Sequence, residues 1–429
     1  MRPFEIILIG FFGVVAVTGL IFLSLYQSKP SAEEQLYGDK VVIWGMFDQG
    51  SMDDFLFEMT NVSKAFKVVS YTQIDSRNFE NEFINAVAEG NAPDLIMIPH
   101  SLLVSVRTKL IPVSFETLPQ RTFKDTYIDG ADIFMRNDGI YGVPFAVDPL
   151  IMFWNRDIFS SAGLSQAPKT WENIVTQTTH ALVQKNDANQ ILQSALAFGE
   201  YQNIAHAKEI LSMLFLQTGS SIVIDKGEAY TVTLNNTENN GSAEAVLNFY
   251  TQFSLPSNNL YTWNRSKKLD RDEFTAGKLA MYFGFGSEIS TIERENPNLN
   301  YDVARVPQGA GATTLRTYGE FYAFAIPKAS QHAKGAYAVA LALSSTQHAQ
   351  TLVEMLNLTP VRRELYLQNT SDPLKDVLFQ SSLIARGWLD PNPQESNKVF
   401  ADMVEEVTSS GGRLKNVILD TVHRLEALF

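Results

Sequence analysis

Residues 88–96, with the sequence Ala-Glu-Gly-Asn-Ala-Pro-Asp-Leu-Ile, decide the fold of this chain. The apolar residues just before them recur at helical spacing on one face: Phe79, Phe83, Ile84 and Val87. Gly90 suits the left-handed position that closes a helix, and the apolar run 95–98 then predicts a buried strand. An earlier β-branched run, 41–44, predicts a strand of the same kind. Strand, helix and strand at this spacing indicate a parallel α/β sheet.

The same alternation continues to the C-terminus, without internal repeats. We expect buried strands at 279–283 and 321–326, and helices at 171–183, 204–216, 243–253, 333–344 and 414–428. A chain of 429 residues is too long for one hydrophobic core, so two lobes of roughly 150–200 residues each are expected.

Composition excludes several functions. The net charge is −13 and no run is rich in Lys or Arg, so the surface repels phosphate backbones and we expect no nucleic-acid partner. The chain holds no cysteine, which rules out disulfides, thiolate metal sites, cysteine nucleophiles and a lipid-modified cysteine anchor. We expect no cofactor and no metal site.

The N-terminus offers a different membrane attachment. Residues 6–25 are uncharged and long enough to cross a hydrocarbon core of about 30 Å at 1.5 Å per residue. A cleaved signal peptide is the alternative, but Glu5 lies in the n-region and no small-residue cleavage pattern follows. We therefore expect an uncleaved transmembrane helix within residues 1–27, followed by a polar stalk at 28–38. Either way, the rest of the chain lies outside the cytoplasmic membrane.

Polar residues follow both predicted N-terminal strands. Asp48 and Gln49 come after the first strand, and His100 and Ser101 after the second. In open α/β sheets the binding crevice lies beyond the carboxyl ends of the strands, so these four residues are candidates for ligand contact. His100 is expected as a wall of the cleft and not as a metal ligand.

Several motifs follow one another in the order of a known family. They are 88–96, the Gly-Ile-Tyr-Gly-Val-Pro segment 139–144, the aromatic-Asn-Arg-Asp stretch 153–159, the Pro-Lys-Thr-Trp-Glu helix start 168–172, the strand entry 274–281 and the Pro-containing segment 358–362. In these motifs, and from about Val41 to the C-terminus, the chain resembles the extracellular solute-binding proteins related to maltose-binding protein. The resemblance implies a two-lobed, periplasmic-binding-protein-like α/β fold of type II. It also implies that residues 39–146 and 320–357 form lobe 1 and that residues 147–319 and 358–429 form lobe 2. The chain then passes from one lobe to the other near Ala146, Gly319 and Leu358.

The resemblance also implies site residues. It selects the same strand ends and adds Phe47, in the turn with Asp48 and Gln49. From the second lobe and the hinges it adds further positions: Asp148, Gly284, Phe285, Tyr318, Glu320 and Trp388. Tyr201 and Asn203 are weaker choices, because their loop matches the family poorly, and Trp44 is either a ligand platform or a core residue. Ser287 stands where maltose-type members carry a cleft tryptophan, which puts a maltodextrin ligand in doubt.

The function implied is that of a receptor and not an enzyme. We expect the solute-binding subunit of an ATP-binding-cassette importer, which closes around a small ligand and passes it to the membrane permease. The acidic site, with Asp48, Asp148 and Glu320, favours a sugar or another polyol, or a cation, over an anion. Two alternatives stay open: a ligand sensor for a membrane signalling partner, and a membrane-anchored glycosidase using paired carboxylates such as Asp148 and Glu320.

Overall fold

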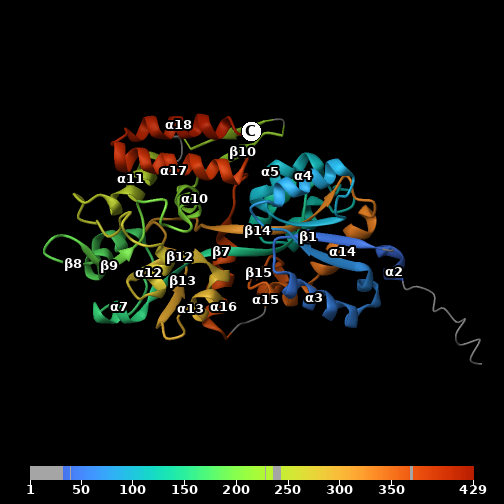
Figure 1. The fold of residues 1–429 in the computed structure, drawn as a ribbon, viewed down its shortest axis with the longest axis horizontal. Helices are drawn as coiled ribbons and strands as arrows, with labels where there is room; N and C mark the ends of the chain where they lie inside the picture. The colour runs from blue at the N-terminus through green and yellow to red at the C-terminus, as the bar shows by residue number, and fades with distance from the viewer. Residues whose placement is uncertain (1–31, 39, 228, 235–242, 368–370) are drawn as a thin grey trace, which may run out of the picture.

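Two long strands run through both halves of the molecule (Figure 1). In the computed structural model, which describes residues 32–38, 40–227, 229–234, 243–367 and 371–429, strand β7 spans Val143–Asn155 and strand β14 spans Thr317–Pro327. They pair antiparallel, and the short strand β15 (Thr359–Pro360) pairs with the other edge of β7. The crossings expected near Ala146, Gly319 and Leu358 fall on or directly beside these three adjacent strands. In the main sheet, β14 and β7 lie between the strands β2, β1 and β3 on one side and β12, β9 and β8 (Gln184–Lys185) on the other.

Lobe 1 is built on parallel strands, as residues 88–96 predict. Strand β1 lies between β2 and β3, and β3 continues the sheet to β14: β1 (Val41–Gly45), β2 (Val69–Gln73), β3 (Leu95–Pro99). The helices of this lobe include α3 (Gln49–Val62), α4 (Phe79–Glu89), α5 (Leu103–Val106), α14 (Ala333–Leu343) and α15 (Thr346–Met355).

The opening motif acts as scaffold. Gly90 ends α4 in the left-handed conformation, with φ of 77°. Asp94 accepts a hydrogen bond from the backbone N–H of Val42 at 3.0 Å and another from the Ser330 hydroxyl at 3.0 Å. The Asp therefore fixes the start of β3 to both β1 and the segment before α14, away from the junction of the lobes.

Lobe 2 extends the same sheet from the other end of β7. Strand β12 (Leu279–Phe285) is antiparallel to β7, β9 (Ile191–Leu196) is parallel to β12, and β13 (Tyr301–Ala304) also pairs with β7. Its helices include α7 (Arg156–Ser161), α10 (Ala207–Gln217), α11 (Ala243–Thr251), α16 (Pro373–Ile384), α17 (Pro393–Ser410) and α18 (Leu414–Glu426). The helix start expected at 168–172 is confirmed: Thr170 is the N-cap, and its side chain accepts a hydrogen bond from the backbone N–H of Asn173.

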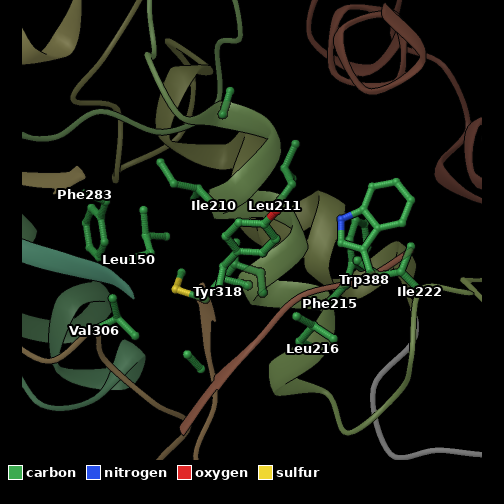
Figure 2. Packing of buried hydrophobic residues seen from close by; sticks show 14 of the residues in the cluster. Leu150, Ile210, Leu211, Phe215, Leu216, Ile222, Phe283, Val306, Tyr318 and Trp388 are labelled. Atoms are coloured by element: carbon green, nitrogen blue, oxygen red, sulfur yellow. The ribbon is translucent and has the colours of Figure 1, made fainter. Parts of the chain in front are cut away.

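The core of lobe 2 packs around helix α10, most of whose residues are buried. Figure 2 shows Trp388 beside Phe215 and Ile222, and Tyr318 of β14 beside Leu211. Strand β14 thus packs directly on α10.

The N-terminal predictions meet the structure only in part. The apolar segment 6–25 lies outside the described residues, and no helix within the described part of the chain has the length and apolarity to span a membrane. The second half of the expected stalk holds helix α2 (Ala32–Tyr37), which packs against α14. Tyr37 is buried, and its ring lies 5.4 Å from that of Phe66.

Candidate functional site

Two carboxyl groups face each other where the lobes join. Asp148 of β7 and Glu320 of β14 are directly opposite in the antiparallel register. Side chains of such a pair project from the same face of the sheet. Both residues were predicted as ligand contacts, and the register brings them together from positions far apart in the sequence.

Glu320 is held in place by neighbours from lobe 1 and the hinge. Its Oε1 accepts a hydrogen bond from the Ser101 hydroxyl at 2.8 Å and lies 3.1 Å from His100 Nδ1. Its Oε2 accepts a hydrogen bond from the Tyr318 hydroxyl at 3.2 Å. Burial acts to raise the pKa of Glu320, but His100, Ser101 and the charge of Lys208 outweigh it and lower the pKa to about 2. The group is therefore a fixed negative charge at the junction.

Asp148 has a different environment. Its Oδ1 accepts a hydrogen bond from the backbone N–H of Ser287 at 3.0 Å, and no Lys or Arg forms an ion pair with it in the described chain. Burial therefore raises the pKa of Asp148 to about 7, with the charge of Glu288 adding to the rise. A carboxyl group near its titration point at neutral pH can either accept a hydrogen bond from a ligand hydroxyl or donate one to it.

Lobe 2 supplies an aromatic wall, at the predicted residue Phe285, and a charged pair that sequence reasoning missed. The Phe285 ring lies 4.9 Å from the ring of His206 and 6.2 Å from that of Tyr318. His206 Nε2 is hydrogen-bonded to Glu288 Oε1, and Glu288 Oε2 accepts a hydrogen bond from the Tyr282 hydroxyl at 2.5 Å. Burial acts to lower the pKa of His206, but Glu288 outweighs it and raises that pKa to about 9.

The one signal that could have found this pair is position. Glu288 lies three residues after Phe285, which the resemblance selected, whereas His206 lies at the start of α10, just after the residues Tyr201 and Asn203 that match the family poorly. Gly284 itself leaves space for an aromatic ring, since a Cβ there would lie 2.4 Å from the ring of Tyr282.

Four predicted residues gather at the end of β1 in lobe 1. The half-buried Phe47 ring lies 5.2 Å from the ring of Tyr322, a β14 neighbour of Glu320, so Phe47 borders the junction. Asp48 is exposed and caps helix α3, accepting a hydrogen bond from the backbone N–H of Ser51 at 2.9 Å. Gln49 exchanges hydrogen bonds with Gln73 and so ties the ends of β1 and β2. Trp44 is half-buried and packs against the core.

The remaining predicted residues serve packing or internal hydrogen bonds. His100 is fully buried: its Nδ1 accepts a hydrogen bond from the backbone N–H of Phe321 at 3.1 Å, and a Cβ on Gly387 would lie 2.2 Å from its Nε2. The Asn203 amide donates to the carbonyls of Asn264 and Lys267, and the Tyr201 hydroxyl donates to Asn397 Oδ1 at 2.6 Å. Trp388 is also buried, and its Nε1–H donates to the Ser212 hydroxyl at 3.1 Å.

A separate hollow opens on lobe 2, with a volume of about 1230 Å³. It lies between α7, the following loop, β13 and α16, and its wall includes Trp154, Arg305 and Val377. None of the predicted ligand residues lines it. We therefore place the candidate site at the Asp148–Glu320 junction and not in this hollow.

Comparison with known proteins gives one family and one fold. The family described as bacterial extracellular solute-binding protein matches residues 57–379. A binding protein of Brucella abortus (strain 2308) is 24% identical over 314 residues, which are 71% of this chain and 70% of that relative. A second Brucella binding protein, from Brucella suis biovar 1 (strain 1330), matches to the same extent.

Solved structures share the architecture at low sequence identity. A cyclo/maltodextrin-binding protein complexed with maltotetraose has a TM-score of 0.73 at 17% identity, covering 94% of this chain and 98% of its own. The sugar-binding protein MalE from Xanthomonas citri has a TM-score of 0.72 at 18% identity, and the match covers 91% of this chain and 97% of MalE. These likenesses establish the two-lobed fold.

Proposed function

The chain belongs to the family of bacterial extracellular solute-binding proteins, and from that premise we propose that it captures a sugar or oligosaccharide between its lobes. It then delivers this ligand to the permease subunits of an ATP-binding-cassette importer. The match to residues 57–379 confirms the family that we expected from the sequence. The proposal adds the class of ligand and the membrane partner.

The observation that carries the ligand class is the pair of opposed carboxyls beside aromatic rings. Sugar hydroxyls are matched by carboxylate acceptors such as Glu320 and by a carboxyl that can also donate, such as Asp148. The C–H faces of a sugar ring pack on flat aromatic surfaces, which Phe285 and Phe47 provide on opposite sides of the junction.

The structural neighbours support the same class. They include proteins solved with maltotetraose, with mannotriose and with α-D-tagatose. Ser287 stands where maltose-type members carry a cleft tryptophan, so we do not narrow the proposal to maltodextrins.

Closure of the lobes is the mechanism. The strands β7, β14 and β15 connect the lobes side by side and form the hinge, and a ligand that contacts both lobes stabilises the closed form. The receptor works on the outer face of the cytoplasmic membrane, and residues 6–25 anchor it there.

The geometry favours binding over glycoside hydrolysis. A glycosidase nucleophile must be free to attack the sugar carbon. The Glu320 carboxylate is instead held by hydrogen bonds from the Ser101 and Tyr318 hydroxyls, with His100 Nδ1 3.1 Å from its Oε1, and a carboxylate has further lone pairs that can accept from a ligand. We therefore assign it to holding ligand hydroxyls and ordering the hinge.

A thermal-shift screen tests the ligand class. We expect at least one of maltotetraose, mannotriose, α-D-tagatose and acarbose to raise the melting temperature, because a ligand at 100 times its Kd stabilises the native state by about 2.7 kcal/mol. Spermidine and a tripeptide serve as the cation and peptide controls. A rise with a control alone would refute the sugar proposal, and so would the absence of a rise with every sugar in a wider mono- and oligosaccharide set.

A further inference from the structure

The hollow on lobe 2 has a floor and walls of its own, apart from the junction of the lobes. Its floor is the sheet where β7 meets β13, and Trp154 and Asp302 are directly opposite in that antiparallel register. Both side chains therefore project from the same face of the sheet, which is the face that lines the hollow. The volume of about 1230 Å³ exceeds the usual range of about 300–1,000 Å³ for small-ligand pockets, so an oligosaccharide has room there.

The walls of the hollow are held together by hydrogen bonds within lobe 2. Gln308 joins the two loops that form the walls, 163–170 and 308–315. Its backbone N–H donates to the Lys169 carbonyl at 3.1 Å, and its own carbonyl accepts a hydrogen bond from the backbone N–H of Trp171 at 3.0 Å. Helix α16 forms a further wall. The hollow is therefore largely preformed, which lowers the ordering cost of binding a ligand there.

Several polar side chains around the hollow have no protein partner within the described chain. Arg156, Lys169 and Arg305 line it, and their side chains form no ion pair or hydrogen bond with another described residue. The same is true of the indole N–H of Trp154. These donors are therefore available to a ligand.

The lining favours a neutral ligand with many hydroxyls over an anion. The carboxylates of Asp302 and Asp376 line the same hollow as the three cations, so an anion would meet repulsion there as well as attraction. Guanidinium, amide and carboxylate groups all form hydrogen bonds with sugar hydroxyls. The indole of Trp154 offers a flat surface for the C–H face of a sugar ring. Its position is fixed by the fully buried Phe159, whose ring centroid lies 5.0 Å away.

Helix α16 separates the hollow from the junction of the lobes. Gln380 of α16 lines the hollow, whereas Leu378 points toward Gly286, where a Cβ would lie 2.6 Å from it and 3.4 Å from Asp148 Oδ1. Asp148 and Trp154 both belong to β7, and six residues at about 3.3 Å each place them about 20 Å apart along the strand. The hollow and the junction are therefore two different places on one strand.

We propose that the hollow is a second carbohydrate-binding site, on the outer surface of lobe 2. Trp154 is the platform for a sugar ring, and the hydroxyls of the sugar bind to Asp302, Arg305 and Gln380. The ligand class follows from the lining of the hollow itself, so the site stands independently of the ligand that we propose for the junction.

Fluorine NMR of protein labelled with 5-fluorotryptophan tests this site by itself. The chain has five tryptophans, and the Trp154→Phe protein identifies the resonance of Trp154. The probes are maltotetraose, mannotriose and acarbose. We expect at least one of them to shift the Trp154 resonance in a saturable way, because a sugar on the indole replaces water there.

Arg305→Gln should raise the midpoint of this titration by about 3- to 10-fold, the range for losing one hydrogen bond to the ligand. The matched control is Arg413→Gln, which removes the same charge at the start of α18 and should leave the midpoint unchanged. Figure 1 shows α18 and α16 on opposite sides of lobe 2. Gln380→Ala provides the same test from α16 if Arg305→Gln fails to fold.

Hexaglutamate serves as the anionic probe. A Trp154 response to hexaglutamate alone would overturn the proposal in favour of an acidic partner, and so would the absence of a saturable response to all three sugars. Equal midpoints in the Arg305→Gln and Arg413→Gln proteins would also overturn it.

The Asp148→Ala protein separates the hollow from the junction. We expect its Trp154 midpoint to equal that of the parent protein, because Asp148 does not line the hollow. A midpoint that rises in Asp148→Ala would show that Trp154 only reports binding at the junction, which would contradict a second site. A failure of the sugar proposal for the junction leaves this measurement unaffected.

Discussion

Replacing Trp388 by alanine is expected to lower the free energy of unfolding by about 3–5 kcal/mol, the range for deleting a buried large aromatic side chain. The indole is 4% exposed, stacks on Phe400 with centroids 6.0 Å apart and donates its N–H to Ser212. Figure 2 shows it packed beside Phe215 on α10. Urea denaturation of the mutant and the parent protein measures the difference.

Ser212→Ala separates packing from hydrogen bonding. It removes only the acceptor of the indole N–H and should cost about 1–3 kcal/mol, the penalty for an unsatisfied buried donor. If Trp388→Ala instead keeps the parent stability and loses ligand binding, the indole lines the cleft, and the packing role that we assign to it is wrong.

Asp148→Ala should weaken ligand binding by roughly 10- to 150-fold, which corresponds to losing about 1.5–3 kcal/mol from one charge-assisted hydrogen bond. Asp148 is buried at the hinge opposite Glu320, where a ligand meets both lobes. Isothermal titration calorimetry with the sugar that raises the melting temperature measures the loss.

Asp48→Ala is the matched control. Because Asp48 is exposed and caps α3, its removal should cost about 1 kcal/mol of stability and change affinity little. The sequence alone predicted ligand contact for both aspartates, and the structure leads us to separate them. Parent-like affinity in a folded Asp148→Ala protein would remove Asp148 from the site.

The local elements could be predicted because each depends on neighbouring residues. Helix α4 with its Gly90 terminus, the strands β1 and β3, and the Thr170 cap all follow from short patterns, and each is present. The two-lobed arrangement could be predicted only from the order of several motifs along the chain. No single local pattern specifies which strands pair with each other.

The chemistry of the junction depends on contacts between distant residues. The opposition of Asp148 and Glu320 is set by the register of two strands, and the His206–Glu288 pair joins residues 82 positions apart. No local pattern signals such a pair. The resemblance pointed to Asp148 and Glu320. It did not point to His206, because the residues just before His206 match the family poorly.

Burial was the property that sequence predicted least well at the site. His100 follows a strand end, as a cleft residue would, yet it is fully buried because Gly387 lets the chain approach its ring. Trp388 directly follows that glycine and is also buried, with its N–H bonded to Ser212 of α10. A polar or aromatic residue at the correct strand end can therefore face the protein interior as readily as the cleft.

Small-angle X-ray scattering during a ligand titration tests closure most directly. The sample is residues 32–429, which keeps Tyr37 packed in lobe 1, and the ligand is the sugar with the largest thermal shift. We expect the radius of gyration to fall as the site fills and to reach its minimum at saturation, with Asp148→Ala requiring a higher sugar concentration. A radius that stays unchanged when calorimetry shows the site to be saturated would contradict capture by closure of the two lobes.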